Sequence, residues 1–81
     1  MEQQDFIDRL VKLRINKGVS ARDMSLSLGQ REGYINNIEN GVNFPSMTVF
    51  FYICDYFSIT PMEFFDIDSN NPVKSKELLE A

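Results

Sequence analysis

The chain has 81 residues, of which 43% are hydrophobic and 25% are charged, so it fits one small globular domain rather than a disordered segment. Its single cysteine, Cys54, excludes an internal disulfide and is expected on the apolar face of a helix, and the lack of histidine leaves no credible zinc site. No apolar run approaches the length of a membrane span, and the first residues do not resemble a signal peptide, so we expect a cytoplasmic protein.

The formal net charge of −4 is unevenly distributed along the chain. Residues 9–31 hold six basic groups and one acidic group, for a net charge of +5, whereas residues 1–8 carry −3 and residues 32–81 carry −6. Affinity for nucleic acid depends largely on Lys and Arg side chains that neutralise phosphates. The overall charge therefore counts against a nucleic-acid partner. The basic segment over residues 9–31 is nevertheless compatible with one.

The first helix is predicted over residues 6–17. Asp5 is the expected cap at its start, and Lys17 followed by Gly18 is typical of a helix end. The apolar residues that recur at helical spacing are Phe6, Ile7, Leu10, Val11 and Leu13. Such a stripe predicts one face turned toward the core.

A short second helix is predicted over residues 21–28. Ser20 and Asp23 resemble a capping box at its start, and Gly29 is suited to the left-handed conformation that ends a helix. Ser25 is a small residue in the middle of this helix, where another helix can cross closely. This combination favours a tightly packed helix pair.

A third helix is predicted over residues 32–39. Ile35 and Ile38 form its apolar edge, and Asn40 followed by Gly41 is a typical stop. The rest of its surface is polar. Ile35 and Ile38 are therefore expected to face the core and to leave a polar face exposed.

Two further helices are predicted in the second half of the domain. Ser46 is the expected cap of the fourth, whose inner stripe comprises Met47, Phe50, Ile53, Cys54 and Phe57. Thr60, Pro61 and Glu63 combine a cap, a proline at the first helical position and an acidic third position, which predicts a fifth helix over residues 61–66. Phe50, Phe57 and Phe64 are expected in the core.

These elements predict an all-α fold, a five-helix domain over residues 1–66. Residues 67–81 form a linker and a short C-terminal tail that could add one or two helical turns over residues 74–81. The second and third helices are separated by a turn that contains glycine, as in a helix-turn-helix. Their facing positions are filled by Met24, Leu28, Ile35 and Ile38.

Three segments, LRINKGVSARDMSLSLG, YINNIENG and PSMTVFFYICDYFSITPMEFF, carry a resemblance to a known family. They are similar to the phage Cro/repressor (XRE-type) helix-turn-helix family, without gaps over about residues 9–66. The resemblance implies a five-helix DNA-binding domain, usually dimeric, that acts as a transcriptional regulator. It also implies a recognition helix at about residues 32–39 that lies in the major groove.

The expected recognition helix carries the candidate DNA-reading side chains. With Ile35 and Ile38 turned inward, Glu32, Gly33 and Asn37 share its outward edge, and they match the principal base-reading positions of the family. Asn can pair with adenine and Arg with guanine, each worth about 1–3 kcal/mol of discrimination. The full set of recognition-helix candidates is Arg31, Glu32, Gly33, Tyr34, Asn36 and Asn37. Plain solvation is an equal alternative for Asn36, and Gly33 brings no side chain.

Phosphate contacts are expected from residues around this helix. The candidates are Lys17, Ser20, Arg22, Asn40 and Asn43. Ala21 stands where the family often has Gln, and Val42 stands where a basic residue is common, so we expect modest affinity and shallow salt dependence. The resemblance also implies a partly buried ion pair between Arg14 and Glu39, which would remove Arg14 from the phosphate contacts.

The predicted function is sequence-specific binding of double-stranded DNA by a transcriptional regulator, with repression favoured, acting as a homodimer. Exposed aromatic residues are the expected interface material, namely Phe51, Tyr52, Tyr56 and Phe65. The alternative is that Leu78 and Leu79 of the same chain cover them.

A second function class stays open: a protein-interaction module on a helix-turn-helix scaffold that binds DNA weakly or not at all. Its support is the net charge and the missing phosphate anchors. An enzyme is not expected, because no residues are placed for acid–base or nucleophilic chemistry. The sequence likewise predicts no cofactor, no metal, no membrane partner and no small-molecule ligand.

Overall fold

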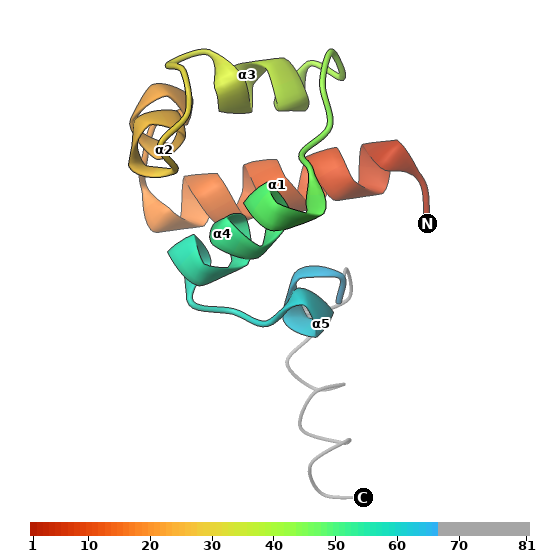
Figure 1. Ribbon diagram of the computed structural model, residues 1–81. Helices are drawn as coiled ribbons and strands as arrows, with labels where there is room; N and C mark the ends of the chain where they lie inside the picture. Colours follow the sequence, from red (N-terminus) through yellow and green to blue (C-terminus); the bar gives the residue numbers. More distant parts are fainter. Residues whose placement is uncertain (67–81) are drawn as a thin grey trace, which may run out of the picture.

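The computed structural model describes residues 1–66, and this part of the chain is all-α. Its helices are α1 (Gln3–Lys17), α2 (Ala21–Ser27), α3 (Tyr34–Glu39), α4 (Met47–Phe57) and α5 (Pro61–Phe64). In Figure 1, α3 lies at the top of the molecule and α5 at the bottom, with α1 and α4 between them. The predicted linker and C-terminal tail, residues 67–81, lie outside the described residues.

Three helices begin at the caps that the sequence predicts. The hydroxyl of Ser20 accepts a hydrogen bond from the backbone N–H of Asp23 at 3.0 Å, and that of Ser46 accepts one from the N–H three residues on at 3.2 Å. Thr60 and Glu63 form a complete capping box, in which each side chain accepts a bond from the other's backbone N–H. These caps satisfy N–H groups that have no partner within the helix.

The start of α1 differs from the prediction. The helix begins at Gln3, with Glu2 at the N-cap, so Asp5 is not the cap but lies in the first turn. There its carboxylate accepts a hydrogen bond from the backbone N–H of Glu2 at 2.7 Å. An acidic side chain is favourable throughout the first turn, so the sequence pattern alone does not decide which turn comes first.

Whereas α1 is longer than predicted, three other helices are shorter. Helix α2 ends at Ser27, because Gly29 has a φ of 73° and turns the chain immediately afterwards. Helix α3 begins at Tyr34 and not at residue 32, since Gly33 precedes it as an N-cap without a side chain. Helix α5 ends at Phe64 instead of residue 66.

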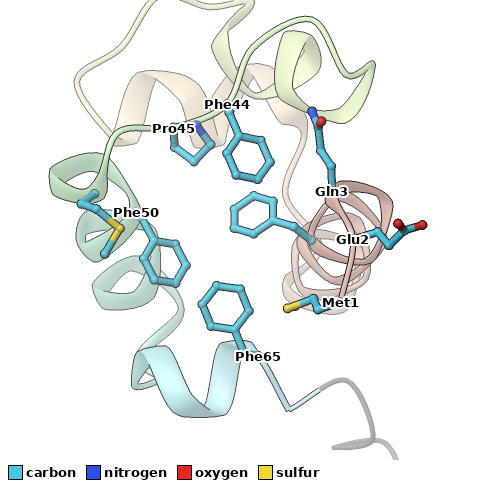
Figure 2. A pocket seen from close by; sticks show the side chains of 9 residues that line it. Met1, Glu2, Gln3, Phe44, Pro45, Phe50 and Phe65 are labelled. Atoms are coloured by element: carbon cyan, nitrogen blue, oxygen red, sulfur yellow. The ribbon is translucent and has the colours of Figure 1, made fainter.

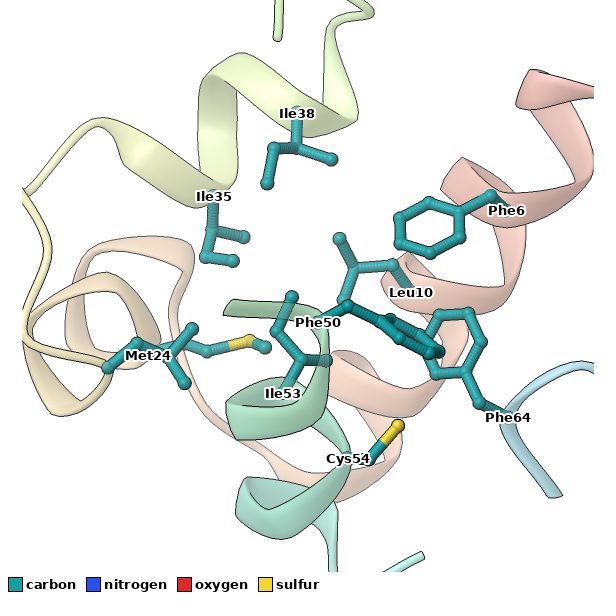
Figure 3. Close-up of a cluster of buried hydrophobic side chains, with 10 residues drawn as sticks. Phe6, Leu10, Met24, Ile35, Ile38, Phe50, Ile53, Cys54 and Phe64 are labelled. Atoms are coloured by element: carbon teal, nitrogen blue, oxygen red, sulfur yellow. The ribbon is translucent and has the colours of Figure 1, made fainter. Parts of the chain in front are cut away.

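One continuous hydrophobic core joins all five helices, as Figure 3 shows. It comprises Phe6, Leu10, Met24, Leu28, Ile35, Ile38, Phe50, Ile53, Cys54 and Phe64. Burial raises the pKa of the Cys54 thiol, with a smaller contribution from the neighbouring Asp55 carboxylate, so the thiol stays protonated. Phe57 is half-buried and packs against this core, whereas Met47 is largely exposed, which corrects that position of the predicted stripe. Met47 is the first residue of α4 and lies at the edge of the core.

Arg9 fastens the short helix α5 to α1. Its Nε donates to the carbonyl of Phe64 and its Nη2 to the carbonyl of Glu63, both at 2.8 Å. Carbonyls in the last turn of a helix have no helical partner, so a guanidinium satisfies them well. One of the basic residues near the front of the chain is therefore used to hold the fold together.

Candidate nucleic-acid interface

Helix α3 presents one buried face and one exposed face, as its sequence predicts. Ile35 and Ile38 are fully buried, whereas Asn36 and Asn37 are exposed. The two isoleucines lie one turn apart and are held by the core, so they fix the rotation of the helix about its axis. The polar side chains consequently point away from the body of the molecule.

A buried hydroxyl joins α2 to α3. Ser25 Oγ donates to the carbonyl of Ala21 at 2.7 Å and accepts a hydrogen bond from the backbone N–H of Ile35 at 2.9 Å. This bond satisfies one of the first N–H groups of α3, which has no side-chain cap of its own. The small size of Ser25 predicts a close crossing of two helices at this position. Nothing in the local sequence pattern predicts the hydrogen bond from the Ile35 N–H.

The far end of α3 is held by the ion pair between Arg14 and Glu39. Nε of Arg14 donates to one carboxylate oxygen at 2.7 Å and Nη2 to the other at 3.0 Å, while Nη1 donates to the carbonyl of Val19 at 3.0 Å. The side chains are only 17% and 12% exposed. The pKa of the Arg14 guanidinium is raised, chiefly by the hydrogen bond to Glu39. Three of the five N–H donors of Arg14 are therefore used within the domain, and its side chain is largely withdrawn from the surface where a phosphate would bind.

An open polar hollow lies along the outward side of α3 and the turn before it. Five of the six recognition-helix candidates line it, namely Arg31, Glu32, Gly33, Tyr34 and Asn37, together with Gln30 and Asn43. Asn36 does not line it. The loop is drawn toward the helix because the carbonyl of Asn37 accepts hydrogen bonds from the N–H groups of Val42, at 2.8 Å, and Asn43, at 3.4 Å. Gln30 was not predicted as a candidate, and no motif marks it.

Glu32 has a partner that the sequence pattern does not reveal. Its carboxylate accepts a hydrogen bond from Nε of Arg22 at 3.1 Å, and both side chains are exposed, at 64% and 69% for Arg22 and Glu32. A base-reading candidate and a phosphate candidate are thus bound to each other. Such an exposed pair is worth at most about 1 kcal/mol and is easily opened.

The remaining phosphate candidates lie apart from the polar hollow. Nζ of Lys17 stands 4.9 Å from the centre of the Tyr56 ring, which is a cation–π contact. Ser20 caps α2, and Asn40 ends α3. Of the five candidates, only Asn43 lines the polar hollow, and Arg22 is joined to it through the bond to Glu32.

Comparisons with known proteins provide no family assignment. No protein-family model, curated protein or solved structure matches the chain. Within residues 1–66 there is no cluster of His, Cys, Asp or Glu side chains suited to a metal ion, and none of the helices in that range is long and apolar enough to cross a membrane.

Proposed function

We propose that the chain is a transcriptional regulator that binds double-stranded DNA as a homodimer, with α2 and α3 forming a Cro/repressor-like helix-turn-helix. The observation that carries the proposal is the exposed hollow in which Arg31, Asn37 and Asn43 converge beside a helix whose opposite face is fully buried. Exposed amide and guanidinium groups on a firmly held helix are suited to reading base edges.

The dimensions of α3 are compatible with a major groove. Its six residues give a helix about 9 Å long. A helix with its side chains is about 10–12 Å across, so it fits the width of a major groove, which is about 12 Å. In this arrangement Asn37 pairs with adenine, while Arg31 contacts guanine or a nearby phosphate. Tyr34 and Asn36 face the sugar-phosphate backbone.

Phosphate binding is the weaker part of the proposed interface. Arg31 makes no ion pair within residues 1–66 and is available to phosphate, whereas Arg14 and Arg22 are already paired. Each phosphate contact adds about one unit to the salt dependence of binding, so few contacts give a shallow dependence. We expect modest affinity per subunit, a cytoplasmic regulator with repression as the favoured mode, and no catalytic activity.

The test is selection of binding sites from random duplex DNA at two salt concentrations. Wild type, Asn37→Ala and Asn36→Ala are compared, because Asn36 is also exposed but lies outside the hollow. We expect wild type and Asn36→Ala to enrich the same motif, and Asn37→Ala to lose about 5- to 150-fold in affinity for it. An unchanged motif and affinity with Asn37→Ala would show that the reading face is assigned wrongly.

A second candidate function is a protein-interaction module with little or no DNA binding. The observation that favours it is that Arg9, Arg14 and Arg22 all form hydrogen bonds within the chain. Among residues 1–66, this leaves Arg31, which lines the polar hollow, as the arginine without such a bond. This candidate takes first place if wild type enriches no motif at the lower salt concentration.

A further inference from the structure

An apolar hollow of about 480 Å³ opens on a different face from the polar one. The start of α1, the loop before α4, the first turn of α4 and Phe65 surround it, and Figure 2 shows Phe44, Phe50, Phe65 and Met1 gathered around the space. Glu2 has the only charged side chain among the residues that line it. We call this surface the apolar face.

The aromatic core continues outward into this face, and no side chain of residues 1–66 closes over it. The ring centre of Phe6 lies 4.8 Å from that of Phe44, 4.9 Å from that of Phe64 and 6.2 Å from that of Phe65. Phe6 and Phe64 are buried, but Phe44 and Phe65 are 54% and 42% exposed. Two large side chains in contact with the core therefore remain half in water.

We propose that a second copy of this chain covers the apolar face, and that this contact is the interface of the homodimer on which the proposed function rests. Around the hollow stand the side chains of Met1 and Met47, 68% and 64% exposed. A two-fold contact needs projecting groups and a cavity within the same patch, because each copy presents the same surface to the other. This face has both.

Charge and area are compatible with self-association. Two copies with a net charge of −4 repel each other, but Glu2 is the only charged side chain that the apolar face brings into the contact. Its four most exposed apolar side chains offer on the order of 400 Å² of apolar surface, which is the size of the largest apolar patch on a typical monomer, and such patches are often functional. A stable dimer buries about 800 Å² per partner, so backbone and rim groups supply the remainder.

The apolar face also adjoins the proposed reading face. Asn43 lines the polar hollow, and the next residue, Phe44, lines the apolar one. A second copy seated on Phe44 fixes the position of both α3 helices relative to each other, as recognition of two half-sites requires. By contrast, Tyr52 and Tyr56, which the sequence offers as interface material, border a separate hollow beside Gly29.

The test is sedimentation equilibrium of the full chain without DNA. We expect a dimer for wild type and at least a tenfold higher dimer Kd for Met47→Glu, since a carboxylate would be buried against its own copy. Met47 is the first residue of α4, a position that favours an acidic side chain, so the variant should fold normally by circular dichroism. Ile15→Glu, 61% exposed near the other end of α1, and Tyr52→Glu are controls expected to leave the Kd unchanged.

Two outcomes overturn the inference: a wild type that is monomeric at millimolar concentration, and a Met47→Glu dimer as tight as wild type. If wild type is monomeric and Leu78→Glu with Leu79→Glu makes it dimerise, the occupant is the tail of the same chain. DNA selection separates the two proposals. A dimer sensitive to Met47→Glu that enriches no motif refutes only the DNA function. A monomer that enriches a motif refutes the interface and the homodimer, but leaves sequence-specific DNA binding standing.

Discussion

The two ends of α3 are held in different ways. At the C-terminal end, Glu39 receives two hydrogen bonds from Arg14 in a largely buried pair. Before the N-terminal end, Glu32 receives one bond from Arg22 in a pair that is mostly exposed. Both contacts join an arginine to a glutamate, yet one is part of the packing of the domain and the other lies at its surface.

The two glutamates are only seven residues apart in the sequence, yet Glu39 has a structural role and Glu32 is accessible to a ligand. A buried, bidentate pair is strongly destabilised when one partner is lost, because the remaining charge has no water around it. An exposed pair exchanges its partner for water or for an anion at little cost. The firmly held end thus orients α3, and the loosely held end keeps Arg22 and Glu32 available to a partner.

The largest predicted effect is on stability at the buried pair. Glu39→Ala leaves the Arg14 guanidinium without its partner, so we expect a loss of about 3 kcal/mol in the free energy of unfolding, measured by urea denaturation. Glu32→Ala is the matched control and should cost less than about 1 kcal/mol. Equal losses for the two variants would mean that the two ends are not held differently.

A smaller loss is expected when the N-terminal end loses its buried bond. Ser25→Ala removes the acceptor of the Ile35 N–H, and an unsatisfied buried donor costs about 1–3 kcal/mol. Ser27→Ala, at an exposed position of the same helix, should change stability by less than about 0.5 kcal/mol. If Ser25→Ala is as stable as wild type, the hydroxyl does not anchor α3.

The exposed pair should influence binding and not folding. Glu32→Gln removes a carboxylate from the polar hollow and frees Arg22 for a phosphate, so we expect roughly fivefold tighter DNA binding at low salt and unchanged unfolding. Fluorescence anisotropy with a selected duplex measures the affinity. Weaker binding would instead identify Glu32 as a direct base contact, for example to cytosine.

The smallest effect concerns Tyr34, the first residue of α3. Burial raises the pKa of its phenol, so the native state favours the neutral form. The resulting stabilisation is complete below the ordinary tyrosine pKa of about 10 and is lost as pH rises through the higher native value. As the pH rises above about 10, wild type should therefore lose more stability than Tyr34→Phe, in paired urea titrations. Identical pH profiles for the two proteins would contradict a raised pKa of Tyr34 in the native state.

Features set by neighbouring residues could be predicted from the sequence. The caps at Ser20, Ser46 and Thr60, the turn at Gly29 and the inward face at Ile35 and Ile38 depend on spacing within one helix, and the structure contains each of them. Helix starts without a side-chain cap were less predictable. At Gly33 no side chain marks the boundary, so the predicted helix is two residues too long.

Contacts between distant segments could not be predicted in the same way. The partner of Arg22 lies ten residues away, and that of Arg9 lies more than fifty residues away. Such contacts depend on how complete helices pack, which no local pattern encodes. The Arg14–Glu39 pair was anticipated only through resemblance to a family, and Gln30 enters the polar hollow without any motif to mark it.

The bonds from Arg9 to α5 have a consequence for the cooperativity of folding. A helix of four residues cannot persist alone in water, and here a side chain from the opposite end of the domain satisfies its terminal carbonyls. Helix α5 can form only where α1 already exists, and α1 gains two of its most distant bonds only when α5 is in place. The two ends of the domain should thus unfold together, and amide hydrogen exchange in α5 should proceed through global opening rather than local fraying.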